Sequence, residues 1–163
     1  MAETVHLFLK SNGSDVKGDS TQESLGRKDS IECVSYQQGV SNATDEATKM
    51  ATGRRQYTPI TIRKRIDKAS PLLIKALVNN EKIDGAFKFF RPSPTGDGTT
   101  EQFYTVTIKE GHVSAISQCS PDTLGAGSDA NPPYEVVSFV FKTINWTVTK
   151  GGVSHEDTWG KNA

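Results

Sequence analysis

Hydrophobic and polar residues alternate in several short segments of this chain, and a period of two is typical of strands with one buried face. The first such segment, 4–10, places Val5, Leu7 and Leu9 on one face and ends at a turn sequence, Ser11-Asn12-Gly13-Ser14. Similar segments follow at 30–38, 58–66, 86–90, 102–108, 113–118 and 137–148. The pattern predicts eight or nine strands.

One segment, at about 70–79, predicts a helix. Ser70 is a good N-cap and Pro71 suits the first helical position, directly after an acidic turn at Asp67. The expected buried stripe is Leu72, Leu73, Ala76 and Leu77, and Asn79-Asn80 ends the helix. This short helix follows the strand at 58–66, which places Thr58, Ile60, Ile62 and Ile66 on one face, interrupted by Lys64. Since Pro59 cannot donate a ladder hydrogen bond, that strand is expected to begin at a sheet edge.

The strand at 30–38 has two mixed faces. One face carries Ile31, Cys33, Ser35 and Gln37, and the other carries Glu32, Val34, Tyr36 and Gln38. By parity we expect Val34 and Tyr36 to face the core.

The last third of the chain contains a change of parity. Val137, Phe139 and Phe141 share one parity, whereas Ile144, Trp146 and Val148 share the other. A strict period of two cannot bury both sets, so we expect a bulge or sharp bend near Lys142-Thr143. Gly151-Gly152 then predicts a hairpin. With a two-residue loop, Trp146 faces Asp157, Val148 faces His155 and Ile144 faces Trp159.

The segment at about 39–56 lacks a clear period and is rich in small polar residues, with a glycine near each end. A structureless connection of this length is unusual inside a compact domain. It is either a surface loop or an extended arm that becomes ordered against a neighbouring molecule.

The composition fits a β-structure with much of its surface exposed to water or to polar partners. The chain has 163 residues, 34% of them hydrophobic, with 15 Ser and 17 Thr on counting, and threonine suits pleated, half-exposed surfaces. Its 19 basic and 19 acidic residues give no net charge, which disfavours nucleic acid as a partner. No apolar run is long enough for membrane insertion, and no signal peptide is visible at the start. The two cysteines, Cys33 and Cys119, are expected to be free and mostly buried thiols.

Candidate chemistry is sparse. His6 and His112 have no carboxylate or cysteine at ligand spacing, and no phosphate-binding loop or nucleophile elbow is present. His155 and Asp157 share a strand face. This is compatible with a couple that serves a serine nucleophile or a metal, or with a buried hydrogen bond that locks the last hairpin beneath Trp146 and Trp159. We favour the structural interpretation and expect no catalytic, cofactor or metal site. The fold expected is one domain, 1–163, mainly β: a single β-barrel of two packed, mostly antiparallel sheets with one flanking helix.

Several segments together resemble a known family. They are Val5-His-Leu-Phe-Leu-Lys10, Asp15-Val-Lys-Gly18, Ser30-Ile-Glu32, Thr58-Pro59, Lys64-x-Ile-Asp67-x-x-Ser70-Pro71-x-Leu-x-x-Ala76, Ile144-x-Trp146 and His155-x-Asp157-x-Trp159. In this order they resemble the Hcp proteins (haemolysin-coregulated proteins) of bacterial type VI secretion systems, over essentially the whole chain.

The resemblance implies a non-enzymatic tube protein without cofactors. Such a protein forms a homohexamer whose rings stack into a hollow tube beneath a VgrG-type spike, inside a contractile sheath. It is present in the bacterial cytoplasm and exported without a signal peptide, and it carries small secreted effectors in its lumen. Cys33, Ser35 and Gln37 are then the lumen candidates. The candidates for contact with other subunits lie in the extended loop: Ala43, Asp45, Glu46, Arg54 and Arg55. The residues expected to be structural are Asp67, Ser70, Pro71, Trp146, His155, Asp157 and Trp159.

Two alternatives remain at this point. A monomeric barrel of this size can bind a small ligand internally, although few large apolar residues remain to line a cavity once the core is filled. A hydrolase built on His155 and Asp157 is the more distant one.

Overall fold

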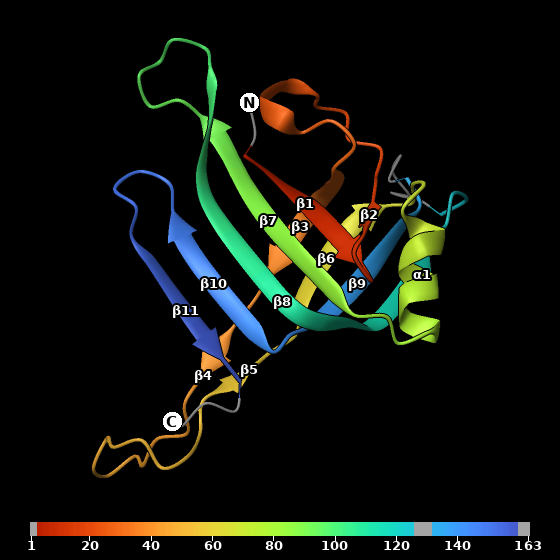
Figure 1. Cartoon of the computed structure of the whole chain (residues 1–163). Helices are drawn as coiled ribbons and strands as arrows, with labels where there is room; N and C mark the ends of the chain where they lie inside the picture. The colour runs from red at the N-terminus through yellow and green to blue at the C-terminus, as the bar shows by residue number, and fades with distance from the viewer. Residues whose placement is uncertain (1–2, 126–131, 160–163) are drawn as a thin grey trace.

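The computed structural model describes residues 3–125 and 132–159, and strands dominate both parts (Figure 1). One α-helix is present there, as the sequence predicts. The strands are β1 (Thr4–Ser11), β2 (Ser14–Val16), β3 (Ile31–Gln37), β4 (Val40–Ser41), β5 (Gln56–Tyr57), β6 (Ile60–Arg65), β7 (Ile83–Pro92), β8 (Thr100–Cys119), β9 (Tyr134–Val140), β10 (Thr143–Val148) and β11 (Ser154–Thr158). The helix α1 spans Ser70–Val78, and a short 3-10 turn, η1, spans Ser24–Gly26.

The main sheet is antiparallel and closes on itself. Its hydrogen-bonded order is β11-β10-β8-β7-β1-β3-β6-β9, and β9 also pairs with β8, which completes a ring of six strands. Closure depends on the 20 residues of β8, because its first half pairs with β10 and its second half with β9. The two sheets expected from the sequence are therefore two sides of one continuous ladder, from which β10 and β11 extend as a flap (Figure 1).

The expected bend in the last third is confirmed. β9 ends at Val140 and β10 begins at Thr143, so Phe141 and Lys142 form the corner between them. Phe139 and Ile144 are both fully buried although their parities differ. The corner thus allows both apolar sets of the sequence to face the same core, which a straight strand cannot do.

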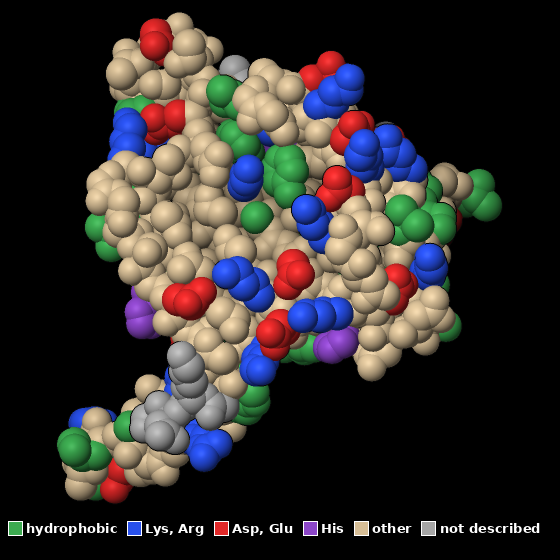
Figure 2. All heavy atoms as spheres, in the orientation of Figure 1, with side chains coloured by type: hydrophobic (Ala, Val, Ile, Leu, Met, Phe, Trp, Pro, Cys, Tyr) green, Lys and Arg blue, Asp and Glu red, His purple; other side chains and the backbone are tan. Residues whose placement is uncertain are grey.

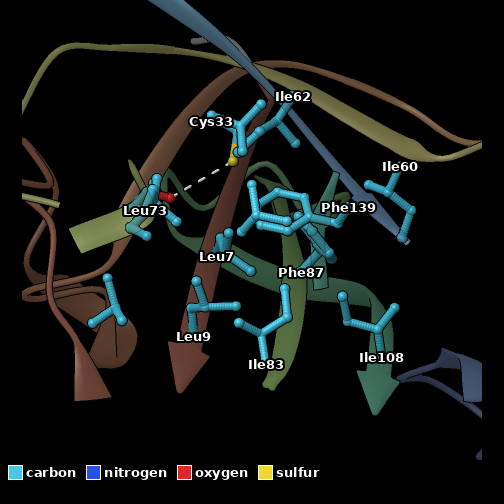
Figure 3. Close-up of a cluster of buried hydrophobic side chains, with 14 of the residues drawn as sticks. Leu7, Leu9, Cys33, Ile60, Ile62, Leu73, Ile83, Phe87, Ile108 and Phe139 are labelled. Atoms are coloured by element: carbon cyan, nitrogen blue, oxygen red, sulfur yellow. Dashed lines mark hydrogen bonds between the residues drawn. The ribbon is translucent and has the colours of Figure 1, made fainter. Parts of the chain in front are cut away.

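Aliphatic and aromatic side chains from all sides of the ring fill its interior (Figure 3). Leu7, Ile60, Phe87 and Phe139 are each completely buried. Burying a side chain of this size stabilises the fold by about 1.5–3 kcal/mol. The interior is a packed core, and this leaves little support for a barrel that binds a ligand inside.

A bulge changes the facing of β3. The register between β3 and β6 shifts between Cys33 and Ser35, so two successive residues of β3 point outward. Val34 is 62% exposed, so the prediction that it faces the core is wrong, whereas Tyr36 packs against the core as predicted. Cys33 is buried beside Ile62, and a lumen-facing position for its side chain is therefore wrong as well.

A buried ion pair lies where the sequence shows an interruption in the apolar face of β6. Lys64 points inward with complete burial, and its ammonium group donates to Glu135 of β9, which is also fully buried. It also donates to Asp67 at 2.9 Å and to the Ser70 hydroxyl at 3.1 Å. Because β6 ends at Arg65, the alternation stops there, and Ile66 is 47% exposed instead of buried as expected.

The helix begins differently from the prediction. Its N-cap is Ala69, and the Ser70 hydroxyl donates to Glu135 at 2.7 Å instead of capping the helix. Asp67 accepts the backbone N–H of Ala69 at 3.0 Å, so the acidic turn holds the entry into the helix. Pro71 occupies the first turn as predicted, but Leu72 is 40% exposed rather than buried. The Ser70 hydroxyl therefore bonds the buried Lys64 and Glu135 and does not cap the helix, because buried charged groups without hydrogen-bond partners cost more free energy than a missing cap.

Candidate functional site

The segment at 39–56 forms an arm that stands clear of the barrel (Figures 1 and 2). β4 and β5 pair at its base, and a single bridge joins Thr44 to Ala51 further out. Near the tip, Asp45 accepts the N–H of Ala47 at 2.8 Å and donates its own N–H to the carbonyl of Met50. The arm is therefore a long, self-paired β-hairpin, not a structureless loop.

Side chains along the arm are available for contact. Residues 40–54 are all exposed, among them the candidates Ala43, Asp45, Glu46 and Arg54. Met50, near the tip, is 67% exposed. Hydrophobic and charged side chains gather at the far end of the arm (Figure 2). The arm therefore offers one apolar side chain and several charged ones to any molecule that contacts its tip.

Arg55, in contrast, is engaged within the chain. Its guanidinium donates to both carboxylate oxygens of Asp157, at 2.5 and 2.8 Å, and to the carbonyl of Thr158 at 3.2 Å. The Tyr57 hydroxyl also donates to Asp157. The hydrogen bonds from Arg55 lower the pKa of the Asp157 carboxyl below its ordinary range, against the opposing effect of burial, and Tyr57 adds to the lowering.

The predicted register of the last hairpin is wrong. Trp146 faces His155 and Ile144 faces Asp157, because the connection between β10 and β11 is longer than two residues. Gly151 and Gly152 both adopt positive φ in this turn, a conformation that glycine takes without strain.

The expected His155–Asp157 hydrogen bond does not form in the described structure. His155 is exposed and stacks on Trp146, with ring centroids 6.0 Å apart. Asp157 is held by Arg55 and Tyr57 instead, which removes the geometric basis of a hydrolase couple. Trp159 is 50% exposed rather than a cover over such a pair. Within residues 3–125 and 132–159, no group of three or more His, Cys, Asp or Glu residues is arranged to hold a metal ion.

The outward face of β3, β6 and β9 carries small polar side chains. Ser35 and Gln37 are exposed there, opposite Arg63 and Thr61 of β6. The Thr61 hydroxyl is 3.2 Å from that of Ser138 on β9. Thr61 and Ser138 were not among the residues predicted for this face, although the alternation of Ile60 and Ile62 already places Thr61 outward. The same parity rule could have identified this face.

The described helix of this chain is too short to span a bilayer.

Comparisons with known proteins agree with one another. A family model described as "Type VI secretion system effector, Hcp" matches residues 8–148. The chain is 30% identical over 146 residues to a "Major exported protein" of Pseudomonas aeruginosa, covering 89% of this chain and 83% of that protein.

Solved structures share the fold. A mutant Hcp1 protein from the E. coli EAEC 042 pathovar superposes with a TM-score of 0.81 at 28% identity, covering 97% of this chain and 99% of that one. A crystal structure of an Hcp protein gives a TM-score of 0.85 at 22% identity, covering 99% and 100% of the two chains.

Proposed function

The chain belongs to the Hcp family of the type VI secretion system, and from this premise we propose that it forms homohexameric rings that stack into a hollow tube. Hcp proteins are structural, exported tube proteins rather than enzymes, and they self-associate. The hexamer, the stacking of rings and the roles of individual residues are the proposed steps.

The observation that carries the proposal is the arm. A self-paired hairpin with residues 40–54 exposed contributes almost nothing to the core of its own chain. Ordering such a segment costs conformational entropy, which contacts with another subunit offset. Ala43, Glu46, Met50 and Arg54 lie where such contacts form. A head-to-tail contact that closes gives a ring, and this makes one patch of each subunit meet a different patch of the next.

The outward face of β3 and β6 is the proposed lumen surface. Ser35, Gln37 and Thr61 supply uncharged hydrogen-bonding groups, and Arg63, opposite Ser35, adds a positive charge, so this surface offers a folded effector both kinds of polar contact. The proposed partners are small secreted effectors inside the tube, a VgrG-type spike at its end and a contractile sheath around it. The protein is made in the bacterial cytoplasm and exported through the apparatus.

The native mass and electron micrographs of the purified chain test the proposal. Six chains of 17.7 kDa give about 106 kDa and a ring with a central hole. A short-arm variant replaces residues 43–54 by Asn-Gly, a dipeptide suited to a two-residue hairpin, and keeps β4, β5 and the bond of Arg55 to Asp157. We expect the wild type to form rings with Gln37 on the inner wall and the short-arm variant to remain smaller. A wild-type chain that is monomeric at every concentration would refute the assembly.

A further inference from the structure

Both roots of the arm are held by the same element, the hairpin of β10 and β11. On the outgoing side, Trp146 of β10 donates its indole N–H to the side-chain carbonyl of Gln38 at 3.3 Å. On the returning side, Arg55 and Tyr57 donate to Asp157 of β11. Residues 55 and 157 are far apart in the chain, so only the folded barrel brings them together. The arm is thus tied to the barrel by specific side chains as well as by its backbone.

The tie has a geometry that fixes direction. Arg55 meets Asp157 through two parallel N–H groups, and this planar arrangement restricts rotation as well as distance. The side chains of Arg55 and Asp157 are only 21% and 18% exposed, so water competes weakly for them. The Tyr57 ring packs edge-on against Phe141, 5.4 Å between centroids, and lies 6.2 Å from Trp146 in a stacked orientation.

The backbone holds the base of the arm at few positions, and one of them is the Thr58 N–H, which donates to the Gly39 carbonyl at 2.9 Å. The base also has two paired positions, Val40 with Tyr57 and Ser41 with Gln56. A two-stranded hairpin of this length is marginally stable on its own in water. The side chains at its root therefore decide how much of the time it points in one direction relative to the barrel.

We propose that Arg55, Tyr57 and Asp157 form a clasp that fixes the direction of the arm before another subunit is met. The clasp residues are positioning residues: they do not contact the second copy but hold the segment that does. The inference rests on the proposed function, because the clasp aids assembly only if the arm contacts another subunit. An arm that already points in one direction loses less conformational entropy when the ring forms. The clasp itself is a property of the single chain, so it can be tested without assembly.

Native cysteines make the direction of the arm measurable. Cys119 is an exposed thiol on the barrel, whereas Cys33 is buried, and burial raises the pKa of its thiol to about 12. Spin labels on Cys119 and on a Glu46→Cys substitution near the arm tip report the distance between barrel and arm by pulsed electron spin resonance. Labelled chains are diluted into an excess of unlabelled chain that also carries the substitutions, so that distances between subunits do not contribute.

Three changes test the clasp in the full chain. Asp157→Asn removes the charge that holds Arg55 but keeps its shape, and Arg55→Ala removes the donor. Arg55→Lys keeps the charge without the two parallel N–H groups and serves where a harsher variant unfolds. Lys142→Ala is the matched control, because it removes an exposed ion pair with Glu110 at the same corner and leaves the clasp intact.

If the clasp fixes the arm, the distances between the labels at positions 119 and 46 should have a narrow distribution. This is expected for the labelled protein without a clasp substitution and for its Lys142→Ala variant. In Asp157→Asn and Arg55→Ala we expect a distribution about twice as wide or wider, with Arg55→Lys in between. Circular dichroism confirms that each variant is folded. A folded Asp157→Asn with an unchanged distribution would overturn the clasp.

Assembly is measured separately by sedimentation. If the fraction of correctly directed arms falls to about one tenth, the apparent dissociation constant of each arm-to-subunit contact rises about tenfold, and rings form only at higher protein concentration. Clasp variants that broaden the distribution but assemble like the wild type would overturn the pre-directing role. A wild type that never assembles, together with a narrow distribution that the variants broaden, would refute the proposed function and leave the clasp standing.

Discussion

The buried ion pair between Lys64 and Glu135 makes a sharp prediction about stability. The substitution Lys64→Met keeps the unbranched stem and removes the ammonium group. Both partners are fully buried, so no water reaches the carboxylate that remains. Glu135 retains the Ser70 hydroxyl at 2.7 Å and the Gln118 amide at 3.1 Å as hydrogen-bond donors, but its charge is left without a cation.

The expected loss is large. Removing one partner of a buried ion pair costs about 3–5 kcal/mol of the free energy of unfolding. For a chain of this size each kcal/mol shifts the midpoint of thermal unfolding by about 2–4 °C, so we expect a decrease of roughly 6–20 °C. Adding Glu135→Gln to Lys64→Met removes the unpaired charge and keeps an acceptor for Ser70. The double variant should therefore be at least about 1 kcal/mol more stable than Lys64→Met alone.

A neighbouring lysine provides the control. Lys68 is half exposed and forms ion pairs with Asp19 at 3.4 Å and with Asp29 at 3.6 Å. Exposed pairs of this kind contribute about 0–1 kcal/mol. Lys68→Ala should thus change stability little, although it removes the same kind of charge from the same motif.

The effect of pH has a definite sign. Burial raises the pKa of the Glu135 carboxyl, but hydrogen bonds from Lys64, Ser70 and Gln118 outweigh burial, so the pKa lies below its ordinary value. A carboxyl with a lowered folded pKa stabilises the fold above its unfolded pKa of about 4.3 and loses that contribution as the pH falls through the folded value. In Lys64→Met the buried Glu135 carboxyl loses its cation and takes up a proton at a higher pH than in the wild type. The difference between wild type and Lys64→Met should accordingly be largest at neutral pH and already shrink as the pH falls toward the unfolded value of about 4.3.

Urea unfolding followed by circular dichroism measures these differences. Each variant is unfolded at two protein concentrations, so that any contribution from assembly is recognised by its concentration dependence. The reasoning is refuted if Lys64→Met costs no more than Lys68→Ala, or if the double variant is less stable than the single one.

Two further predictions concern the N-terminal third. Gly18→Ala should lower stability by about 1–3 kcal/mol, because its new Cβ lies 2.7 Å from the Ser30 carbonyl oxygen and 2.9 Å from the Ile31 Cα, both backbone atoms. Gly53→Ala in the arm meets only Ala43 at 3.6 Å and should unfold thermally like the wild type; equal midpoints for the two variants would contradict this. Burial lowers the pKa of His6, against the raising effect of Glu32 and together with the lowering effect of Arg27. The unfolded chain then binds a proton more readily, so stability should decrease as the pH falls below about 6.5. His6→Gln should flatten this dependence in urea unfolding between pH 7.5 and 5, whereas replacing the exposed His155 should not. Identical slopes in all three proteins would exclude His6 as the cause.

The arm shows how much of the candidate functional site can be predicted from the local sequence pattern. Its boundaries and its polarity follow from the sequence, since small polar residues without a period cannot join a buried strand, and the sequence left a surface loop and an ordered arm as alternatives. The partners of its root do not follow, because Arg55 and Asp157 are separated by about a hundred residues and nothing in either neighbourhood specifies the other. The sequence pairs Asp157 with His155 by proximity, and the fold pairs it with Arg55.

The alternation of the sequence by itself determined most of the strands, the helix near 70–78 and the corner near residue 142, because each depends on which side of a short segment is apolar. It predicts two segments at 102–108 and 113–118, which the fold joins in the single strand β8. The tertiary structure alone decided three further features: the inward position of Lys64, the use of Ser70 as a buried partner instead of a cap, and the bulge that exposes Val34. Each of these depends on groups brought together from distant strands. A buried ammonium group needs acceptors from β9 and from the turn before α1, and only the closed ring supplies them all.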